Sequence, residues 1–209
     1  MIVKLVLLRH GQSKWNQENR FTGWKNVDLS EKGILEAKAS GLLLKKNKIQ
    51  IDKVFTSNLK RAINTAEIAL KEACYDHLFK NKKLVIHKDQ AMNERDYGDL
   101  TGLNKAETAN KYGKDQVHIW RRSYEINPPG GESLKDVVTR VGPYFNKVIL
   151  NDLNLGNNIL LSAHGNSLRA LFLILKLNTI KNISKVEIPT GKPFIIEFKN
   201  KKIFKSFYL

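Results

Sequence analysis

Two histidines in this sequence stand at the ends of apolar segments, and each is followed by a glycine. His10 comes after segment 2–8 and Arg9, and His164 comes after segment 158–163. A continuous apolar run is typical of a strand buried on both faces, and open α/β folds bind ligands at the carboxyl ends of such strands. A neutral imidazole beside a guanidinium can attack phosphorus while the cation holds the phosphoryl oxygens. The pattern therefore predicts phosphoryl transfer at one edge of a sheet.

Arginines near these positions favour a functional interpretation over a structural one. A single histidine of this kind is more often structural, and a solvated strand end explains Arg-His-Gly alone equally well. Arg61 lies in the first turn of a predicted helix, where the helix dipole disfavours a cation, so a functional reason for it is more credible. Arg121 and Arg122 could hold a carboxylate or phosphate in bidentate fashion, although such a pair is usually a solvated helix face. The chain has only eight arginines, and four of them fall at these candidate positions.

The length and composition indicate one globular domain. The 209 residues, 42% of them apolar, suffice for one full core and are few for two. The sequence has no apolar run of membrane-spanning length, and segment 2–8 lacks the features of a signal peptide. The single cysteine, Cys74, excludes an internal disulfide and fits a reducing compartment. We therefore expect a cytoplasmic protein without a membrane partner.

The net charge of +16 raises the question of nucleic-acid binding. The 36 lysines and arginines are spread along the chain, without a basic tail or an arginine-rich segment. We therefore expect no nucleic-acid partner and assign most of the lysines to the solvated surface, where the excess charge would attract small anionic substrates. A basic nucleic-acid-binding protein on a degenerate enzyme scaffold is the alternative, and it predicts a steep salt dependence of binding to DNA or RNA.

Apolar and amphipathic segments alternate along the chain, as in α/β folds. Strands are expected over 2–8, 51–57, 84–86, 158–163, 194–198 and 203–207, the last two as a closing hairpin. Helices are expected over 31–44, 59–72, 103–127, 132–150 and 167–175, with Ser30 as the N-cap of the first. Ile34 and Val148 are expected on buried helix faces, and Gly142–Pro143 is expected to bend the helix over 132–150.

Longer motifs resemble the histidine phosphatase superfamily and, within it, the cofactor-dependent phosphoglycerate mutases. Segment 8–13 is similar to the superfamily signature. Further stretches similar to the mutases follow in order at Asn16, 21–24, 28–33, 56–62, 103–105, 120–122, 131–134, 162–169 and 188–191. The resemblance implies an α/β three-layer sandwich with a mostly parallel central sheet flanked by helices. It also implies one catalytic domain over 1–209, in which about 99–131 form a helical lid or substrate-binding insertion.

The resemblance implies a role for each candidate site residue. His10 would be the nucleophile that carries the phosphoryl group as phosphohistidine, and Glu94 would donate and accept the proton of the substrate hydroxyl. Arg9, Arg61 and His164 would stabilise the transferring group in the transition state. Substrate-binding roles are implied for Ser13, Asn16, Thr22, Gly23, Arg61, Glu94, Tyr97, Lys105, Arg121, Arg122, Gly165 and Asn166.

The implied reaction is an isomerisation, the interconversion of 3-phosphoglycerate and 2-phosphoglycerate in glycolysis and gluconeogenesis. The implied cofactor is 2,3-bisphosphoglycerate, which primes the phosphohistidine. No metal is expected, since the sequence has no carboxylate cluster with the spacing of metal ligands. The implied assembly is a homodimer or a homotetramer.

Three departures from the family pattern bear on closure of the site. Asp96 stands where many members have histidine, which would remove a cation near the site. The connection 127–131 is much shorter than in the longer members, and the sequence ends at Leu209 without the flexible tail of some members. From these differences we expect weaker exclusion of water. The alternative function is therefore a histidine phosphatase that acts on small phosphomonoesters, for which Lys105 and Arg122 would be unimportant.

Overall fold

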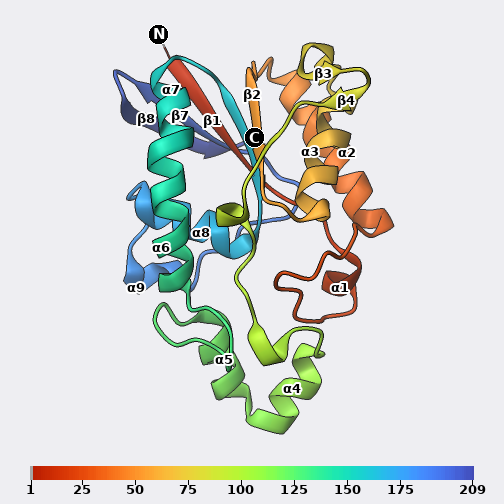
Figure 1. Cartoon of the computed structure of the whole chain (residues 1–209), viewed down its shortest axis with the longest axis vertical. Coiled ribbons are helices and arrows are strands. Elements are labelled where there is room, and N and C mark those ends of the chain that lie inside the picture. Colours follow the sequence, from red (N-terminus) through yellow and green to blue (C-terminus); the bar gives the residue numbers. More distant parts are fainter. Residues whose placement is uncertain (1) are drawn as a thin grey trace.

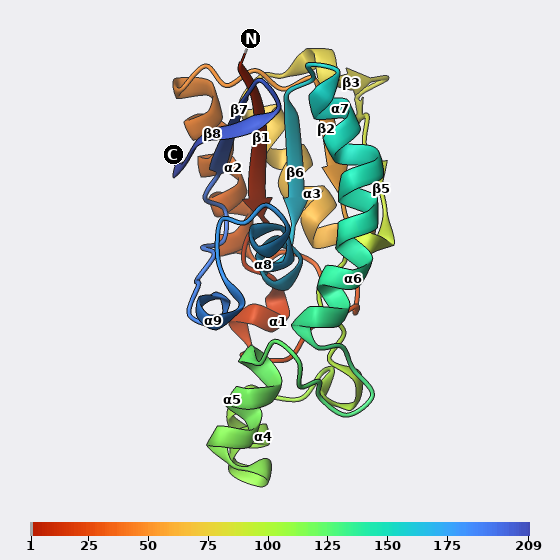
Figure 2. The ribbon, with the colours of Figure 1, turned by 90° about the vertical axis from the view of Figure 1, so that its left-hand side faces the viewer.

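A computed structural model describes residues 2–209 of the chain. A six-stranded sheet in the order β5-β2-β6-β1-β7-β8 forms its centre, with helices on both faces (Figures 1 and 2). The four parallel strands are β1 (Ile2–Arg9), β2 (Lys53–Thr56), β5 (His87–Lys88) and β6 (Ile159–Ala163). An antiparallel hairpin of β7 (Phe194–Lys199) and β8 (Lys202–Tyr208) completes one side. The predicted fold class, a mostly parallel sheet between helical layers, is confirmed.

The two central strands carry the two candidate histidines. Every residue of β6 is buried, as its unbroken apolar run predicts for a strand covered on both faces. β1 pairs with β6 in parallel, with Arg9 opposite Ala163. This register brings His10 and His164, the next residue of each chain segment, side by side at the carboxyl edge of the sheet.

Successive residues of β1 fill two separate cores, because side chains along a strand alternate between its faces. Val6 and Leu8 pack in a cluster with α2 (Glu31–Lys46) and α3 (Lys60–Glu72). Leu5 and Leu7 pack in a second cluster on the opposite face. The helices of that face are α6 (Leu134–Tyr144), α7 (Leu150–Asn154) and α8 (Gly165–Ile174), seen in front of the sheet in Figure 2.

A pair of helices projects from the carboxyl edge, away from both layers (Figure 1). These are α4 (Lys105–Tyr112) and α5 (Lys114–Arg122). They divide at Gly113, whose φ of +90° lies in the left-handed region that favours glycine. The remaining elements are α1 (Lys14–Gln17), α9 (Ile180–Ile183), β3 (Phe79–Lys80), β4 (Lys83–Leu84), three 3₁₀ turns at Asp76–Leu78, Gln90–Met92 and Gly98–Leu100, and a π-helical turn at Phe145–Ile149.

Most predicted elements are confirmed, but the helix predicted over 103–127 is two helices, α4 and α5, and ends at Arg122. The strand predicted over 84–86 is wrong. Leu84 ends β4, which pairs with β3 in a separate two-stranded sheet, and the main sheet is joined instead by His87–Lys88. Leu84 and Ile86 are apolar because they pack against the cluster under α2 and α3. Their apolar character therefore reflects burial beside the sheet and not within it.

Two predicted core positions are also wrong. Ile34 is 39% exposed, while Ala37, Gly41 and Leu44 on the same helix are buried. Val148 is 38% exposed, and Ile149 is buried in its place. The helix becomes π-helical directly after Pro143, which lacks an N–H for the helical ladder, and the wider turn moves Ile149 onto the core face.

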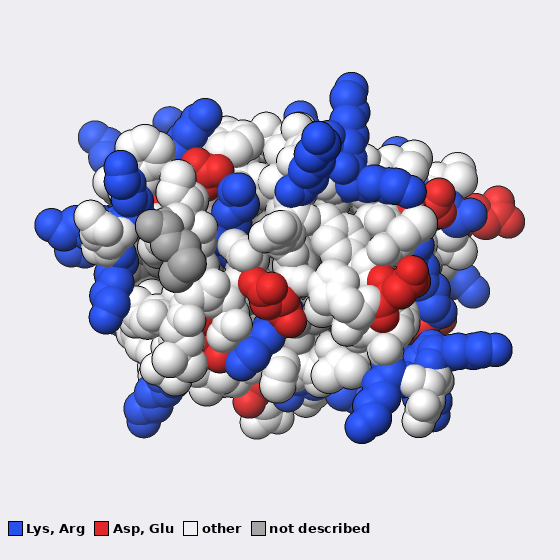
Figure 3. Space-filling model, turned by 90° about the horizontal axis from the view of Figure 1, so that it is seen from above, with Lys and Arg blue, Asp and Glu red and all other residues white. Residues whose placement is uncertain are grey.

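Figure 3 shows how charge is distributed on one face of the molecule. At the end of the molecule opposite to α4 and α5, lysines and arginines surround a mostly uncharged centre, with acidic side chains among them (Figure 3). This face shows no single continuous basic patch of the kind that tracks a nucleic-acid backbone.

Candidate active site

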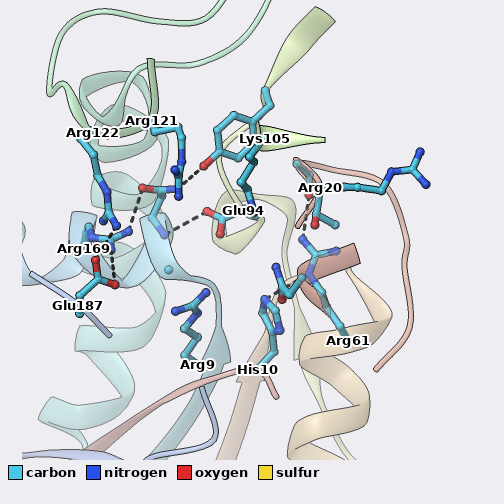
Figure 4. A pocket seen from close by; sticks show the side chains of 16 residues that line it. Arg9, His10, Arg20, Arg61, Glu94, Lys105, Arg121, Arg122, Arg169 and Glu187 are labelled. Atoms are coloured by element: carbon cyan, nitrogen blue, oxygen red, sulfur yellow. Dashed lines mark hydrogen bonds and ion pairs between the residues drawn. The ribbon is translucent and has the colours of Figure 1, made fainter. Parts of the chain in front are cut away.

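A cavity of about 170 Å³ opens at the carboxyl edge of the sheet (Figure 4). It is lined by Arg9, His10, Asn16, Arg20, Thr22, Gly23, Arg61, Glu94, Tyr97, Lys105, Arg121, Arg122, Gly165, Asn166, Arg169 and Glu187. Six of the eight arginines of the chain therefore converge on one cavity. Such a concentration of cations in a concave site selects small, highly charged anions.

His10 is held with Nδ1 protonated and Nε2 unprotonated, and Nε2 accepts a hydrogen bond from Arg61 Nε. The residue is 3% exposed, and its backbone N–H donates to the carbonyl of Ala163. Nδ1 lies 2.6 Å from the carbonyl oxygen of Gly11, which can only accept, so Nδ1 carries the proton and Nε2 carries the lone pair. Burial, with the charges of Arg61 and Arg9, lowers the pKa of His10 well below 6.5. The imidazole therefore remains a neutral nucleophile at neutral pH.

Gly11 allows this strand end to pass close to α2. A Cβ atom at Gly11 would lie 2.2 Å from the carbonyl oxygen of Gly33, so no other residue fits without movement of the backbone. The N–H of Gly11 donates to Thr65 Oγ1 at 3.0 Å, which ties the same segment to α3. The loop that orients His10 is thus fixed against both helices of one layer.

Arg61 is held rigidly against His10. It is 1% exposed, and it donates to the carbonyl oxygens of Lys25 and Gly23, each at 2.8 Å. Its Nε lies 3.3 Å from Nε2 of His10. Burial lowers its pKa to about 10, so the guanidinium stays charged at neutral pH. A cation fixed in this way can stabilise negative charge that develops on a group transferred to His10.

Arg9 and His164 present donors that no described group satisfies. Arg9 donates through NH1 to the carbonyl of Ile188 at 2.6 Å, and its buried Nε has no partner among residues 2–209. Nε2 of His164 lies 2.7 Å from Ser57 Oγ, while its buried Nδ1 also has no partner among these residues. With the Ser57 proton donated to Nε2, Nδ1 carries the N–H of His164, whose ring centroid is 4.9 Å from that of His10.

Glu94 is the carboxylate nearest to this group. Oε1 accepts from the backbone N–H groups of Arg95 at 2.8 Å and Asn166 at 3.0 Å. Burial alone raises its pKa, but these two hydrogen bonds and the charges of Arg61 and Arg9 outweigh burial and set the pKa below 4.5. Glu94 is therefore ionised at neutral pH and able to accept a proton.

The outer part of the cavity is formed by α4 and α5. Lys105 begins α4, and Arg121 and Arg122 end α5. Burial lowers the pKa of both Lys105 and Arg121. The hydroxyl of Tyr97, beside them, accepts from Arg95 NH2 at 3.3 Å. These cations form a second positively charged region of the cavity, which could hold an anionic group.

The structure brings nearly all of the predicted site residues together. Ser13 and His164 do not line the cavity: Ser13 is fully buried and caps α1 by accepting from the N–H of Asn16. His164 lies directly behind His10 and is itself fully buried. Asp96, whose substitution for histidine was expected to remove a cation near the site, does not line the cavity. Its Oδ1 accepts from the N–H of Gly98 and holds the turn that carries Tyr97.

Several residues that serve the site were missed from the sequence. Arg20, Arg169 and Glu187 line the cavity, and Ser57 orients His164. The concentration of arginines was a usable signal for Arg20 and Arg169, since other arginines of this small set were already candidates. Glu187 and Ser57 gave no such signal.

Arg140 was also missed, although it determines where Glu94 lies. It forms a double ion pair with Glu132, at 2.7 and 2.9 Å. It also donates to the carbonyl oxygens of Ala91, Asn93 and Glu94 at 2.6 to 3.1 Å. Arg140 thereby fixes the backbone of the loop from which Glu94 projects.

Two kinds of feature are absent from the part of the chain that the structure describes. Among residues 2–209, no three or more histidine, cysteine, aspartate or glutamate side chains form a group that could hold a metal ion. Within the same range, no helix has the length and apolar character needed to cross a membrane.

Known proteins of two kinds resemble this chain. The 2,3-bisphosphoglycerate-dependent phosphoglycerate mutase of Methylocella silvestris is 51% identical over 195 residues, which are 93% of this chain and 92% of that protein. The enzyme of the same name from Lachnoclostridium phytofermentans is 46% identical, with 98% of this chain and 90% of that protein covered. Among solved structures, a native mycobacterial glucosyl-3-phosphoglycerate phosphatase has a TM-score of 0.79 at 25% identity, covering 100% of this chain and 97% of that one. Bacillus stearothermophilus YhfR has a TM-score of 0.79 at 27% identity, covering 97% and 94%.

The family assignment rests on nearly the whole chain. The profile of the histidine phosphatase superfamily (branch 1) matches residues 5–207, from the first strand to the last. This range includes His10, His164 and the arginines around them. The chain therefore belongs to branch 1 of the histidine phosphatase superfamily.

Proposed function

We propose that this protein is a 2,3-bisphosphoglycerate-dependent phosphoglycerate mutase that interconverts 3-phosphoglycerate and 2-phosphoglycerate through a phosphohistidine at His10. The observation that carries the proposal is a single cavity with two cationic ends. One end surrounds Nε2 of His10, and the other holds Lys105, Arg121 and Arg122. A small molecule with a phosphate at one end and a carboxylate at the other matches this arrangement.

His10, Arg61, Arg9 and His164 carry the phosphoryl transfer in this proposal. The lone pair on Nε2 of His10 attacks phosphorus while the bond to the leaving oxygen breaks, and the reverse step returns the phosphoryl group to a substrate hydroxyl. Arg61, the Nε of Arg9 and the Nδ1 of His164 stabilise the equatorial oxygens. Because these groups are buried and fixed before substrate binds, they require little reorganisation in the transition state.

Glu94 moves the proton in this proposal. Its pKa is low in the free site, so the carboxylate can accept the proton of the substrate hydroxyl as that oxygen bonds to phosphorus. A phosphoryl group on His10 adds negative charge near Glu94 and raises its pKa. The same carboxyl can therefore return the proton when the hydroxyl forms again.

The residues present fit 2,3-bisphosphoglycerate as the priming cofactor. When bound, this compound would supply the phosphoryl group that loads His10. Three buried polar atoms lack partners among residues 2–209 on this side of the site, namely Arg9 Nε, His164 Nδ1 and Thr22 Oγ1. All three atoms can donate hydrogen bonds, which is what phosphoryl oxygens need, and buried donors of this kind are rarely left unpaired. Asn16, Gly23 and Asn166 line the cavity beside them.

We also propose that residues 99–131 act as a lid and substrate-binding insertion within a single catalytic domain. α4 and α5 stand clear of the sheet layers and contribute Lys105, Arg121 and Arg122 to the cavity (Figures 1 and 4). The carbonyl of Arg121 accepts from Arg95 at 2.6 Å, which ties α5 to the loop that carries Glu94. As part of the same proposal, the enzyme works in the cytoplasm, where its single cysteine stays reduced.

The alternative function is hydrolysis of phosphomonoesters, and the solved structure of a phosphatase with this fold favours it. Sequence identity favours the mutase, at 46 to 51% against 25 to 27% for these structures. The short connection 127–131 does not argue against the mutase. The match to the Methylocella silvestris enzyme spans 195 residues and 93% of this chain, so that enzyme has no long insertion here either.

Phosphorus NMR of the purified protein with 3-phosphoglycerate tests the proposal. Parallel samples contain or lack a trace of 2,3-bisphosphoglycerate, and each is measured with and without a chelator. We expect 2-phosphoglycerate to form, faster with the bisphosphate and at the same rate with or without the chelator. Accumulation of inorganic phosphate in place of 2-phosphoglycerate would show that water is the acceptor and that the protein is a phosphatase.

A further inference from the structure

Glu187 is an acidic residue in a cavity otherwise built for anions, and the mechanism above does not use it. Among the described lining residues, Glu94 is the other acidic one, and it has a role in proton transfer. Glu187 lies between α9 and β7, and its side chain is 68% exposed. Its Oε1 is 2.5 Å from NH2 of Arg122, and its Oε2 is 3.8 Å from NH2 of Arg169 (Figure 4).

The backbone on both sides of Glu187 is fixed, while the side chain is free to turn. The carbonyl of Val186 accepts from Arg169 Nε at 2.9 Å. The carbonyl of Ile188 accepts from Arg9 NH1 at 2.6 Å. An exposed carboxylate on an anchored backbone can leave Arg122 by rotation of its own side chain, without movement of the loop.

Arg122 is one of the cations that the proposed function assigns to the carboxylate of phosphoglycerate. A carboxylate of the protein therefore occupies the position that a carboxylate of the substrate needs. Both are planar acceptors that suit a guanidinium, so they compete for the NH2 group of Arg122.

We propose that Glu187 is an internal counter-ion that the substrate carboxylate displaces from Arg122, and that it thereby sets the affinity for phosphate esters that carry a carboxylate. This inference rests on the proposed function, because it takes phosphoglycerate as the ligand. Displacement lowers the affinity for carboxylate-bearing substrate and product, and so favours product release. A phosphate ester without a carboxylate leaves Glu187 in place and is unaffected.

The test is isothermal titration calorimetry with two matched ligands, 3-phosphoglycerate and glycerol 3-phosphate, which lacks the carboxylate. Binding is measured in a His10→Ala background so that no phosphoryl transfer occurs, with folding checked by circular dichroism. His10→Gln replaces it if the alanine variant does not fold. Glu187→Gln removes the counter-ion, and Glu18→Gln is the control, because Glu18 is an exposed acid paired with another cavity arginine, Arg20, at 3.1 Å.

We expect Glu187→Gln to lower the dissociation constant of 3-phosphoglycerate by about two- to fivefold, the range of an exposed ion pair. The dissociation constant of glycerol 3-phosphate should stay unchanged, and Glu18→Gln should alter neither. Equal tightening of both ligands by Glu187→Gln, equal effects of the two variants, or no effect on 3-phosphoglycerate would each overturn the inference. The readout is binding alone, so it is separate from the NMR experiment, whose failure would instead reject the mutase reaction.

Discussion

The two ends of the cavity are built differently. At the inner end, His10 and Arg61 are 3% and 1% exposed. His10 follows a strand and Arg61 lies in the first turn of a helix, and backbone carbonyl groups of neighbouring loops fix both side chains. At the outer end, the side chain of Arg122 is 22% exposed and pairs with Glu187, which is 68% exposed. Buried side chains held in one position can stabilise a transition state. Solvent-exposed side chains in an ion pair can exchange one partner for another. In the proposed function, reactivity therefore resides at the inner end of the cavity and selectivity at the outer end.

The largest expected effect comes from removing the nucleophile at the inner end. His10→Gln should abolish turnover of 3-phosphoglycerate and the acid-labile phosphoenzyme, because an amide cannot form the bond to phosphorus. A coupled assay and acid-quench labelling measure the two. Turnover near that of the wild type, in a variant shown to be folded by circular dichroism, would refute the role of His10.

Arg61→Lys should test whether fixed geometry at the inner end matters beyond charge. Lysine keeps the charge but cannot contact His10 and the carbonyls of Gly23 and Lys25 at once. We expect kcat to fall by about 100- to 1,000-fold. Arg20→Lys is the matched control at the same cavity, where Arg20 stacks on Trp15 near the surface. A similar loss in both variants would mean that charge alone matters.

Arg140→Gln should show whether the position of Glu94 depends on the hydrogen bonds that Arg140 donates to the backbone of its loop. Loss of the bonds to the carbonyl oxygens of Ala91, Asn93 and Glu94 displaces the general acid and base. We expect kcat to fall by about ten- to a hundredfold, with a much smaller change in KM. Steady-state kinetics and the pH profile of kcat provide the measurement. Lower stability with unchanged kcat would leave Arg140 a purely structural role.

The outer end should respond in the opposite way. Lys105→Ala or Arg121→Ala removes a charged partner of the substrate carboxylate, so KM for 3-phosphoglycerate should rise by about tenfold or more. Any hydrolysis of p-nitrophenyl phosphate, which has no carboxylate, should change less than twofold. If both substrates were affected equally, the division of the cavity into two functions would be lost.

The smallest effect is on stability. Burial and neighbouring arginines hold the pKa of His10 and His164 well below 6.5 in the folded state, so below that pH the unfolded chain binds more protons. The free energy of unfolding should therefore fall as the pH drops below 6.5, by up to about 1.4 kcal/mol per pH unit for each histidine. Urea denaturation from pH 7.5 to 5 measures the slope. His10→Gln should reduce it, whereas replacement of exposed His118 by Gln should not.

The elements that could be predicted correctly are those whose residue pattern lies within one continuous stretch of sequence. Long apolar runs predicted β1 and β6, because a strand buried on both faces needs apolar residues throughout. The two-residue strand His87–Lys88 carries no such pattern and was missed. Val148 was placed wrongly because the π-helical turn after Pro143 depends on the backbone and not on apolar spacing.

The site follows the same division. Glu94 was found through a motif around it, whereas its support, Arg140, contacts carbonyl groups 46 to 49 residues away in the chain. The pair of Glu187 with Arg122 joins residues 65 positions apart. Contacts of this range arise from packing of α5, α6 and the loop before β7, and single-sequence patterns do not encode them.

The proposed nucleophile and the proposed chemistry could be predicted from the sequence alone. Arg9, His10 and Gly11 follow an apolar strand and are neighbours in the covalent chain, so they lie together in any fold. This combination of residues predicts phosphoryl transfer. The tertiary structure decided which nitrogen of His10 reacts, since the carbonyl of Gly11 holds the proton on Nδ1. It also decided that six arginines share one cavity and that Glu187 competes there for Arg122. The selectivity of the cavity for anionic ligands depends on the distances between charged residues from segments far apart in the sequence. Only the folded chain sets those distances.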